Sequence, residues 1–304
     1  MEPEQLKQYE ADGCIFPVRG LFRPERLEEI DRLLSTLVAE RPQVEKGDEQ
    51  TLAPEDLLNL HLTCKEVWEL CREPSVLEVA AQILGCQDVS VFTSRILCKE
   101  PGTGKEIVWH QDSNYWPLTD PFDAGTLTPA PRVTSLWLAL DEVTRENGAM
   151  EVLPFSAQPE SRRNLPQEFI LDSGGSTKAF DNFNLSLDSS KLNVAQKRPV
   201  LLQRGEAEFH SAYTIHRSEP NRSERRRLAW IVRYCPTGTQ VVPGIRDSFD
   251  EDYPLVPVLG RGAVEAPAGA LPLAEGAEGA AAKSLAAREI YLPCFGNAVK
   301  ELKK

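Results

Sequence analysis

The hydrophobic periodicity of this chain changes near residue 88, and this change restricts the folds open to it. Before that point, apolar residues recur at the 3.6-residue spacing of amphipathic helices, as in residues 24–40. After it, short runs with the two-residue alternation of strands are separated by turn residues such as Pro101-Gly102. Helices followed by many short strands predict a mainly β domain with flanking α-helices, in which the strands form a β-sandwich or jelly roll.

Three helical regions and one strand are expected before residue 88. The helices cover residues 3–12, about 24–40 and about 64–84, and the strand is Cys14–Val18. Pro74 suits the first turn of the third region, and Gly85 suits its C-terminal cap. His61 lies between two leucines just before this region, so we interpret it as a structural residue rather than a metal ligand.

Strands dominate the sequence from residue 88 to residue 242. The clearest run is 132–143, whose almost continuous apolar residues are typical of a strand covered on both faces. The turn Glu146-Asn147-Gly148 ends it, and further strands are expected at 149–153, 199–203, 207–216 and 227–235. Residues 156–198 contain a long polar segment, which is usually a lid, a binding loop or disordered in a domain of this kind.

We therefore expect a single domain over residues 1–242, with N-terminal helices in 1–87 and a jelly-roll core in 88–242. Residues 243–304 are expected to form a C-terminal extension with a segment rich in alanine and glycine. A single large all-β domain with added helices accommodates a chain of 304 residues.

Composition restricts the partners and the compartment. The chain has 46 acidic and 34 basic side chains and a net charge of -12, which opposes a general role on nucleic acid or anionic lipid. Its seven cysteines are odd in number and form no C-x-x-C pair, so we expect neither a zinc ribbon nor a disulfide framework. No signal peptide and no apolar run long enough for a membrane span is seen. We expect a cytoplasmic, intracellular protein.

The stretch Trp109-His110-Gln111-Asp112 carries the first candidate for chemistry. His110 and Asp112 are two residues apart, and on a strand this spacing points both side chains to the same face. Two histidines and one carboxylate on one face of an octahedral ion form the usual iron site of non-haem Fe(II) oxygenases. A His-x-Asp triplet alone is weak support, because a surface turn with a solvated aspartate has the same pattern.

His216 is the candidate for the second histidine. The segment Glu219-Pro220-Asn221 indicates a turn between two strand-like runs. If the hairpin is symmetric about residues 221 and 222, His216 and Arg227 face each other across the two strands. Arginine is well shaped for bidentate binding of a carboxylate, which suits a dicarboxylate cofactor chelated to the metal.

His210 competes with His216 for the role of metal ligand. Both lie on the same face of one expected strand, where six residues span roughly 20 Å, so both cannot bind one ion. We assign the metal to His216, because only His216 is paired with an arginine in the expected register. His210 is expected to line the same cavity, where the small Ala212 and Thr214 leave room for a bound molecule.

The order of these motifs resembles the phytanoyl-CoA dioxygenase family of Fe(II)/2-oxoglutarate oxygenases. The matching segments are His110-Gln111-Asp112, Leu136-Trp137-Leu138-Ala139-Leu140-Asp141, Glu146-Asn147-Gly148-Ala149-Met150, His216-x-Ser218-x-x-Asn221-x-Ser223 and Arg227. The likeness runs from about Gly13 to Pro236, and the combined pattern is specific. Residues from about 243 onwards have no counterpart in it.

The resemblance implies a double-stranded β-helix and a set of site residues. The implied iron ligands are His110, Asp112 and His216, and the implied partner of the distal carboxylate of 2-oxoglutarate is Arg227. Family positions near this cosubstrate are matched by Gln111, Trp137 and Ser218. Trp137 is explained equally well as an aromatic residue of the core.

One segment departs from the family pattern. Where the family commonly has Pro-Gly-Ser-His, this chain has Pro154-Phe155-Ser156-Ala157. The missing histidine is not a metal ligand in the family, so the implied iron site is unaffected. The loop that begins here is the part nearest the substrate, and no family substrate is carried over for that reason.

We therefore expect an Fe(II)- and 2-oxoglutarate-dependent dioxygenase that uses O₂ to hydroxylate a small molecule, while 2-oxoglutarate is decarboxylated to succinate. Asp112 favours hydroxylation, because related halogenases replace this carboxylate by a small residue. The alternative is a catalytically silent, cupin-like protein that binds a metal or a small molecule, which the altered 154–157 segment favours. A metal-free interaction module is the third interpretation, and the complete ligand set argues against it.

Overall fold

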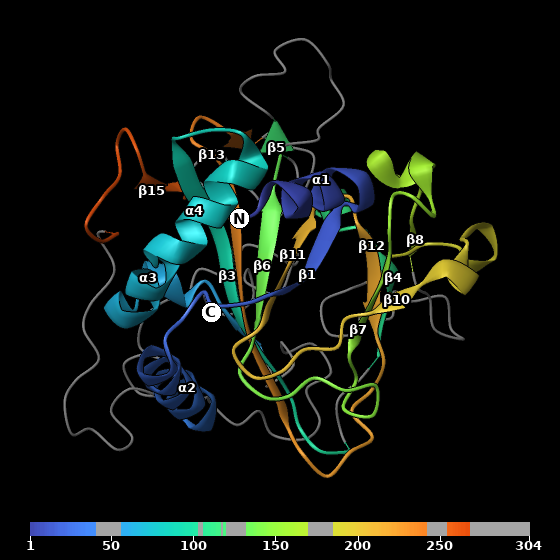
Figure 1. The fold of residues 1–304 in the computed structure, drawn as a ribbon, viewed down its shortest axis with the longest axis horizontal. Coiled ribbons are helices and arrows are strands. Elements are labelled where there is room, and N and C mark those ends of the chain that lie inside the picture. Colours follow the sequence, from blue (N-terminus) through green and yellow to red (C-terminus); the bar gives the residue numbers. More distant parts are fainter. Residues whose placement is uncertain are drawn as a thin grey trace, which may run out of the picture.

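The structure is a computed structural model that describes residues 1–40, 56–102, 106–116, 118–119, 132–169, 185–241 and 254–267. Two antiparallel sheets face each other at its centre, and helices cover the outer face of the larger sheet (Figure 1). This is the mainly β jelly roll with flanking helices that the sequence predicts.

The larger sheet has seven strands, and its path runs β1-β11-β6-β13-β3-β15 with β2 also paired to β3. Their bounds are β1 (Cys14–Val18), β2 (Asp56–Leu58), β3 (Val89–Lys99), β6 (Thr134–Ala139), β11 (Ala207–Ser211), β13 (Arg227–Pro236) and β15 (Val256–Leu259). All six residues of β6 are buried, so this strand is covered on both faces as predicted, although it is shorter than the expected 132–143.

The smaller sheet has four strands in the order β10-β7-β12-β4. Their bounds are β4 (Ile107–His110), β7 (Met150–Leu153), β10 (Arg198–Pro199) and β12 (Ile215–Ser218). Two short pairs lie outside the main sheets: β5 (Leu118–Thr119) with β14 (Gln240–Val241), and β8 (Glu168–Phe169) with β9 (Leu185–Ser186). Single 3-10 turns occur at η1 (Leu60–Leu62), η2 (Asp112–Asn114), η3 (Pro159–Arg162), η4 (Ser189–Lys191) and η5 (Val194–Gln196).

Four helices precede the core in the part of the chain that the structure describes, and prolines and glycines set several of their ends. They are α1 (Pro3–Asp12), α2 (Pro24–Ala39), α3 (Lys65–Cys71) and α4 (Pro74–Leu84). The expected single region at 64–84 is two helices, because Pro74 lacks an N–H and disfavours helix in the residue before it. As predicted, Pro74 begins a helix and Gly85 caps it with a φ of 64°.

The expected strand at 207–216 is wrong as a single strand. It breaks after Ser211, and the chain turns through residues 212–214 into the other sheet. The Thr214 hydroxyl donates a 2.6 Å hydrogen bond to the carbonyl of Gly13, which fixes this turn against β1. His210 therefore lies on β11 of the larger sheet and His216 on β12 of the smaller sheet, and the two sheets face each other.

Two expected segments fall partly outside the described residues. In the 156–198 segment, 170–184 is not described, and the flanks contain η3, η4, η5 and the β8–β9 pair. In the C-terminal extension, β15 adds a strand to the larger sheet beside β3, and the indole Nε1 of Trp68 donates a 2.7 Å hydrogen bond to the Glu265 carbonyl. Among the helices described, none combines the length and the apolar character that crossing a membrane would require.

Candidate metal centre and cosubstrate site

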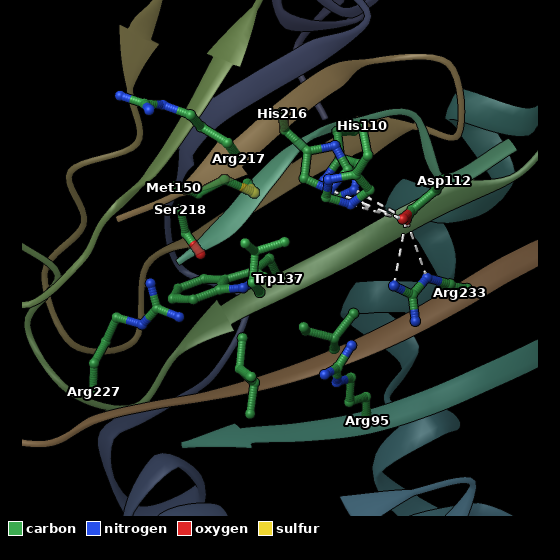
Figure 2. A pocket seen from close by; sticks show the side chains of 14 residues that line it. Arg95, His110, Asp112, Trp137, Met150, His216, Arg217, Ser218, Arg227 and Arg233 are labelled. Atoms are coloured by element: carbon green, nitrogen blue, oxygen red, sulfur yellow. Dashed lines mark hydrogen bonds and ion pairs between the residues drawn. The ribbon is translucent and has the colours of Figure 1, made fainter. Parts of the chain in front are cut away.

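A cavity between the two sheets gathers the predicted site residues. The end of β4, the turn η2, strand β12 and the start of β13 supply His110, Asp112, His216, Ser218 and Arg227 to its wall (Figure 2). Because side chains alternate along a strand, one face of each strand points into this cavity and the other away from it.

His110, Asp112 and His216 converge at one end of the cavity. His216 lies directly opposite His110 across the β12–β4 pair, and their ring centroids are 4.1 Å apart. The Nε2 atoms of His110 and His216 lie 3.5 Å and 3.9 Å from Oδ1 of Asp112. All three side chains are buried, and their ligand atoms lie within 4.8 Å of one another. The three groups could therefore hold one metal ion.

Backbone contacts prepare both imidazoles for metal binding. The Nδ1 atom of His110 lies 2.8 Å from the carbonyl oxygen of Val108, and that of His216 lies 2.9 Å from the carbonyl oxygen of Thr214. A carbonyl oxygen only accepts, so each Nδ1 carries the proton and each Nε2 keeps its lone pair for a metal. Burial, followed by the neighbouring His110, lowers the pKa of His216 well below 6.5, which keeps this imidazole neutral.

Asp112 is ionised despite complete burial. Burial would raise its pKa, but Arg233 and the surrounding histidines lower it well below 3.8. The guanidinium of Arg233 donates to Oδ2 of Asp112 from Nε at 3.4 Å and from Nη2 at 3.3 Å. The donor set is thus two imidazoles, each with Nδ1 bonded to a backbone carbonyl, and one carboxylate, which fits a ferrous ion with open coordination positions.

His210 lies much closer to His216 than its sequence separation suggested. Their ring centroids are 4.8 Å apart, so the expectation of roughly 20 Å along one strand was wrong. His210 instead bonds through Nδ1 to Oε2 of the buried Glu208 at 2.8 Å. Burial would lower the pKa of His210, but Glu208 and Asp112 raise it to about 9. An imidazole that is protonated at neutral pH is a poor metal ligand.

Arg227 lies toward the other end of the cavity. Its guanidinium carbon is 5.4 Å from the centre of the Trp137 ring, and its Nη1 donates to the carbonyl of Gly148. Lys99 lies opposite Arg227 in the β3–β13 register, and its Nζ donates to the Ser218 hydroxyl at 2.8 Å. Two buried cations and a hydroxyl therefore meet at this end, which suits a carboxylate.

The expected hairpin that pairs His216 with Arg227 is wrong. His216 pairs with His110 and Val152 in the smaller sheet, whereas Arg227 pairs with Lys99 in the larger sheet. The connection crosses between the sheets, and the side-chain amide of Asn221 holds it by donating to the carbonyl of Lys99 at 2.9 Å. Arg227 still lines the same cavity, from the facing sheet.

Gln111 and the 154–157 segment are used to hold the surrounding chain. The amide of Gln111 donates to the carbonyls of Ser161, Arg163 and Tyr213 at 2.7–3.1 Å, so the structure does not bring it into the group around Arg227. The ring of Phe155 packs against Gly13, whose φ is 73° and where a Cβ would lie 2.5 Å from that ring. Phe155, one of the residues that depart from the family pattern, therefore packs against the C-terminal end of α1.

Comparison with known proteins agrees with this geometry. The sequence profile of the phytanoyl-CoA dioxygenase family matches residues 9–229. The chain belongs to the phytanoyl-CoA dioxygenase family. With the His–Asp–His group, this membership identifies it as a non-haem iron dioxygenase and confirms the resemblance seen in the sequence.

Curated relatives are between a quarter and a third identical to the chain over the segments that match. L-proline trans-4-hydroxylase of Streptomyces griseoviridis is 32% identical over 83% of this chain and 94% of its own length. A Caenorhabditis elegans phytanoyl-CoA dioxygenase domain-containing protein 1 homolog is 27% identical over 74% of this chain and 88% of its own. Ectoine dioxygenase of Bordetella parapertussis is 26% identical, and the match spans 67% of this chain and 60% of that protein.

Solved structures with a similar fold confirm the double-stranded β-helix. The 2-oxoglutarate-dependent carbocyclase SnoK from nogalamycin biosynthesis superimposes with a TM-score of 0.62 at 19% identity, covering 84% of this chain and 93% of SnoK. EvdO2 from Micromonospora carbonacea, complexed with 2-oxoglutarate, gives 0.60 at 20% identity over 80% of this chain and 94% of its own.

Three charged residues of the site are not among those predicted from the sequence. Lys99, Glu208 and Arg233 are buried on the cavity side of the larger sheet. A signal was present, because Arg95 and Lys99 lie four residues apart, and so on one face, in the otherwise apolar run 95–99 of β3. Two charged residues on one face of a fully buried strand indicate a cavity on that face.

Proposed function

We propose that this protein is an Fe(II)- and 2-oxoglutarate-dependent hydroxylase that acts on a small molecule. The convergence of His110, Asp112 and His216 with Arg227 in one buried cavity carries the proposal. The three ligand side chains would occupy one face of the ion and leave the other positions open.

Iron bound here supplies the activation of O₂ coupled to decarboxylation of 2-oxoglutarate, which gives succinate and CO₂ and leaves one oxygen atom for the substrate. The chain's own contribution is to bind and orient. Asp112 provides the carboxylate ligand, and its presence favours hydroxylation over halogenation. The buried walls exclude water from the reacting groups.

Arg227 and Lys99 are the proposed partners of the distal carboxylate of 2-oxoglutarate. The Gly148 carbonyl and the Ser218 hydroxyl now accept hydrogen bonds from Arg227 and Lys99, respectively. A carboxylate oxygen is a stronger acceptor than a carbonyl, because the bond is then charge-assisted on both sides. Trp137 forms the apolar surface beside Arg227, where the methylene groups of the cosubstrate would lie.

The relatives support a small-molecule substrate. By name, they include enzymes that act on L-proline, ectoine and hypophosphite. These compounds differ greatly, so we expect the residues around the metal and the cosubstrate to determine the reaction class and the remaining wall of the cavity to determine the substrate. Tyr115 and Trp116 follow the metal-binding motif and are buried near it, and they are our candidates for that wall.

Succinate release tests the proposal. Purified protein is incubated with Fe(II), 2-oxoglutarate and O₂, alone and with a panel of amino acids, compatible solutes and small oxyanions. We expect one or more compounds to stimulate succinate formation in wild-type protein. The control variant Asp88→Ala, which removes a surface carboxylate paired with Arg261, should respond in the same way. Asp112→Ala should be inactive.

The silent binder predicted as the alternative gives a different result. A wild-type protein that binds Fe(II) and 2-oxoglutarate but makes no succinate across the panel, with or without added compound, would favour the binder. Failure to bind Fe(II) at all would reject the proposed hydroxylase.

A further inference from the structure

The two oxygens of Asp112 have different surroundings. Oδ1 faces the metal-binding Nε2 atoms of His110 and His216, at 3.5 Å and 3.9 Å. Oδ2 lies 3.3 Å from the guanidinium of Arg233 (Figure 2). One oxygen is therefore directed at the ion and the other at a cation of the protein.

Arg233 is itself held in place. Its Nη1 donates to the hydroxyl of Thr93 at 3.2 Å, and Thr93 lies opposite it in the β3–β13 register. Its guanidinium carbon is 4.9 Å from the centre of the Trp116 ring, within cation–π range. Burial of the side chain limits exchange of these contacts with water. A planar group fixed by a hydroxyl and an aromatic face can orient a carboxylate.

His210 supports the same oxygen from another strand. Its Nε2 lies 3.8 Å from Oδ2 of Asp112, while its Nδ1 is bonded to Glu208 at 2.8 Å. Glu208 has no solvent exposure, so it holds the ring of His210 at a fixed angle. Oδ2 thus lies between the guanidinium of Arg233 on β13 and the imidazole of His210 on β11.

We propose that Arg233, assisted by His210, is a positioning residue that restricts Asp112 to binding the metal through Oδ1 alone. The inference rests on the proposed function and extends it to the number of open coordination positions. A carboxylate can bind a metal through one or both oxygens. An octahedral ion with three single-atom protein ligands keeps three positions, enough for a chelating 2-oxoglutarate and O₂, whereas a two-oxygen Asp112 would remove one.

Co(II) titration of the purified protein tests this positioning role. Co(II) replaces Fe(II) without air oxidation, and its visible absorption reports the coordination of the ion. We compare wild type with Arg233→Gln, Arg233→Lys and the matched control Arg226→Gln. Arg226 also donates from Nε to an aspartate, Asp141, at 3.2 Å, but away from the cavity.

We expect Arg233→Gln to bind Co(II) about 10–100-fold more weakly, the usual effect of removing a group that orients a metal ligand, and to show an altered visible spectrum. Arg233→Lys should fall between Arg233→Gln and wild type, because it restores the charge but not the planar fork. Arg226→Gln should match wild type in both measurements. A general loss of stability would not change the spectrum of the metal-bound protein.

Wild-type affinity and spectrum in Arg233→Gln would overturn the inference and leave the proposed function standing. If the wild-type protein itself binds neither Co(II) nor Fe(II), the proposed function fails and the inference fails with it. If Arg233→Gln does not fold, Thr93→Val replaces it, since it removes only the hydroxyl that anchors Arg233. Wild-type behaviour of both Thr93→Val and Arg233→Lys would then overturn the inference.

Discussion

The two faces of the larger sheet are equally buried but chemically opposite. On the outer face, Trp230 and Leu228 pack with the helices in one apolar cluster. On the inner face of the same strands, Arg227, Arg233 and Lys99 are all less than 10% exposed. A charged side chain is seldom buried unless it is paired. The inner face is therefore built for binding, and the outer face for stability.

Two buried histidines show the same contrast. His61 lies on the outer side, where its Nδ1 bonds to the Ser94 hydroxyl at 2.8 Å, and burial lowers its pKa to about 3. His210 lies on the inner side, and its pKa is about 9 because Glu208 and Asp112 outweigh the effect of burial. Burial alone keeps His61 neutral, whereas the neighbouring carboxylates reverse the effect of burial at His210.

The largest effect is expected at the metal end of the inner face. His110→Ala and His216→Ala each remove one of three proposed ligands, so Fe(II) affinity should fall by more than the roughly 100-fold seen for residues that only orient ligands. His210→Ala should still bind one Fe(II) per chain. Calorimetric or chelator-competition titration measures this. Loss of iron in His210→Ala but not in His216→Ala would reverse our assignment of the second histidine.

The next largest effect is expected on the outer face. Trp230 is fully buried, and Trp230→Ala should lower the free energy of unfolding by about 3–5 kcal/mol through loss of packing. Trp230→Phe should lower it less, because the indole Nε1 has no hydrogen-bond partner among the described residues. Urea denaturation measures both. If Trp230→Ala weakened 2-oxoglutarate binding in protein that remains folded, the assignment of binding to the inner face and stability to the outer face would be wrong.

Arg227 provides the matching test of the inner face. Charged hydrogen bonds contribute about 1.5–3 kcal/mol each, so Arg227→Ala should weaken the binding of 2-oxoglutarate by roughly two orders of magnitude. The affinity of Arg227→Lys should fall between those of wild type and Arg227→Ala. Succinate release against 2-oxoglutarate concentration gives the three values, and urea denaturation checks folding. An unchanged dependence on cosubstrate in Arg227→Ala would refute the carboxylate contact.

The smallest effect is the pH dependence that His61 adds to stability. Its folded pKa of about 3 lies below the ordinary 6.5, so the unfolded chain binds the proton more readily below pH 6.5. The stability is complete above pH 6.5 and falls on acidification by about 1.4 kcal/mol per unit, or about 2 kcal/mol at pH 5. His61→Asn should lose less stability than wild type between pH 7 and pH 5. Equal losses in urea denaturation at the two pH values would contradict this.

Local features of the structure followed from the sequence because their causes lie within a few residues. Pro74 begins α4 because it needs no N–H partner there, and Gly85 ends it because its φ is positive. Asn147 and Gly148 form the predicted turn, since the Asn147 side chain accepts from the Thr144 N–H at 2.8 Å. His110 and Asp112 are neighbours on the chain, so their convergence required only a strand end.

The tertiary structure decided which sheet each strand joins. The break between His210 and His216 depends on a hydrogen bond from Thr214 to Gly13, 201 residues away, which no periodicity reveals. This break placed His210 beside His216, across the cavity. Arg227 lies on the larger sheet, opposite His216 on the smaller sheet. Arg233 and Lys99 became site residues in the same way, because strand register across β3 and β13 is set by packing between distant segments rather than by local preference.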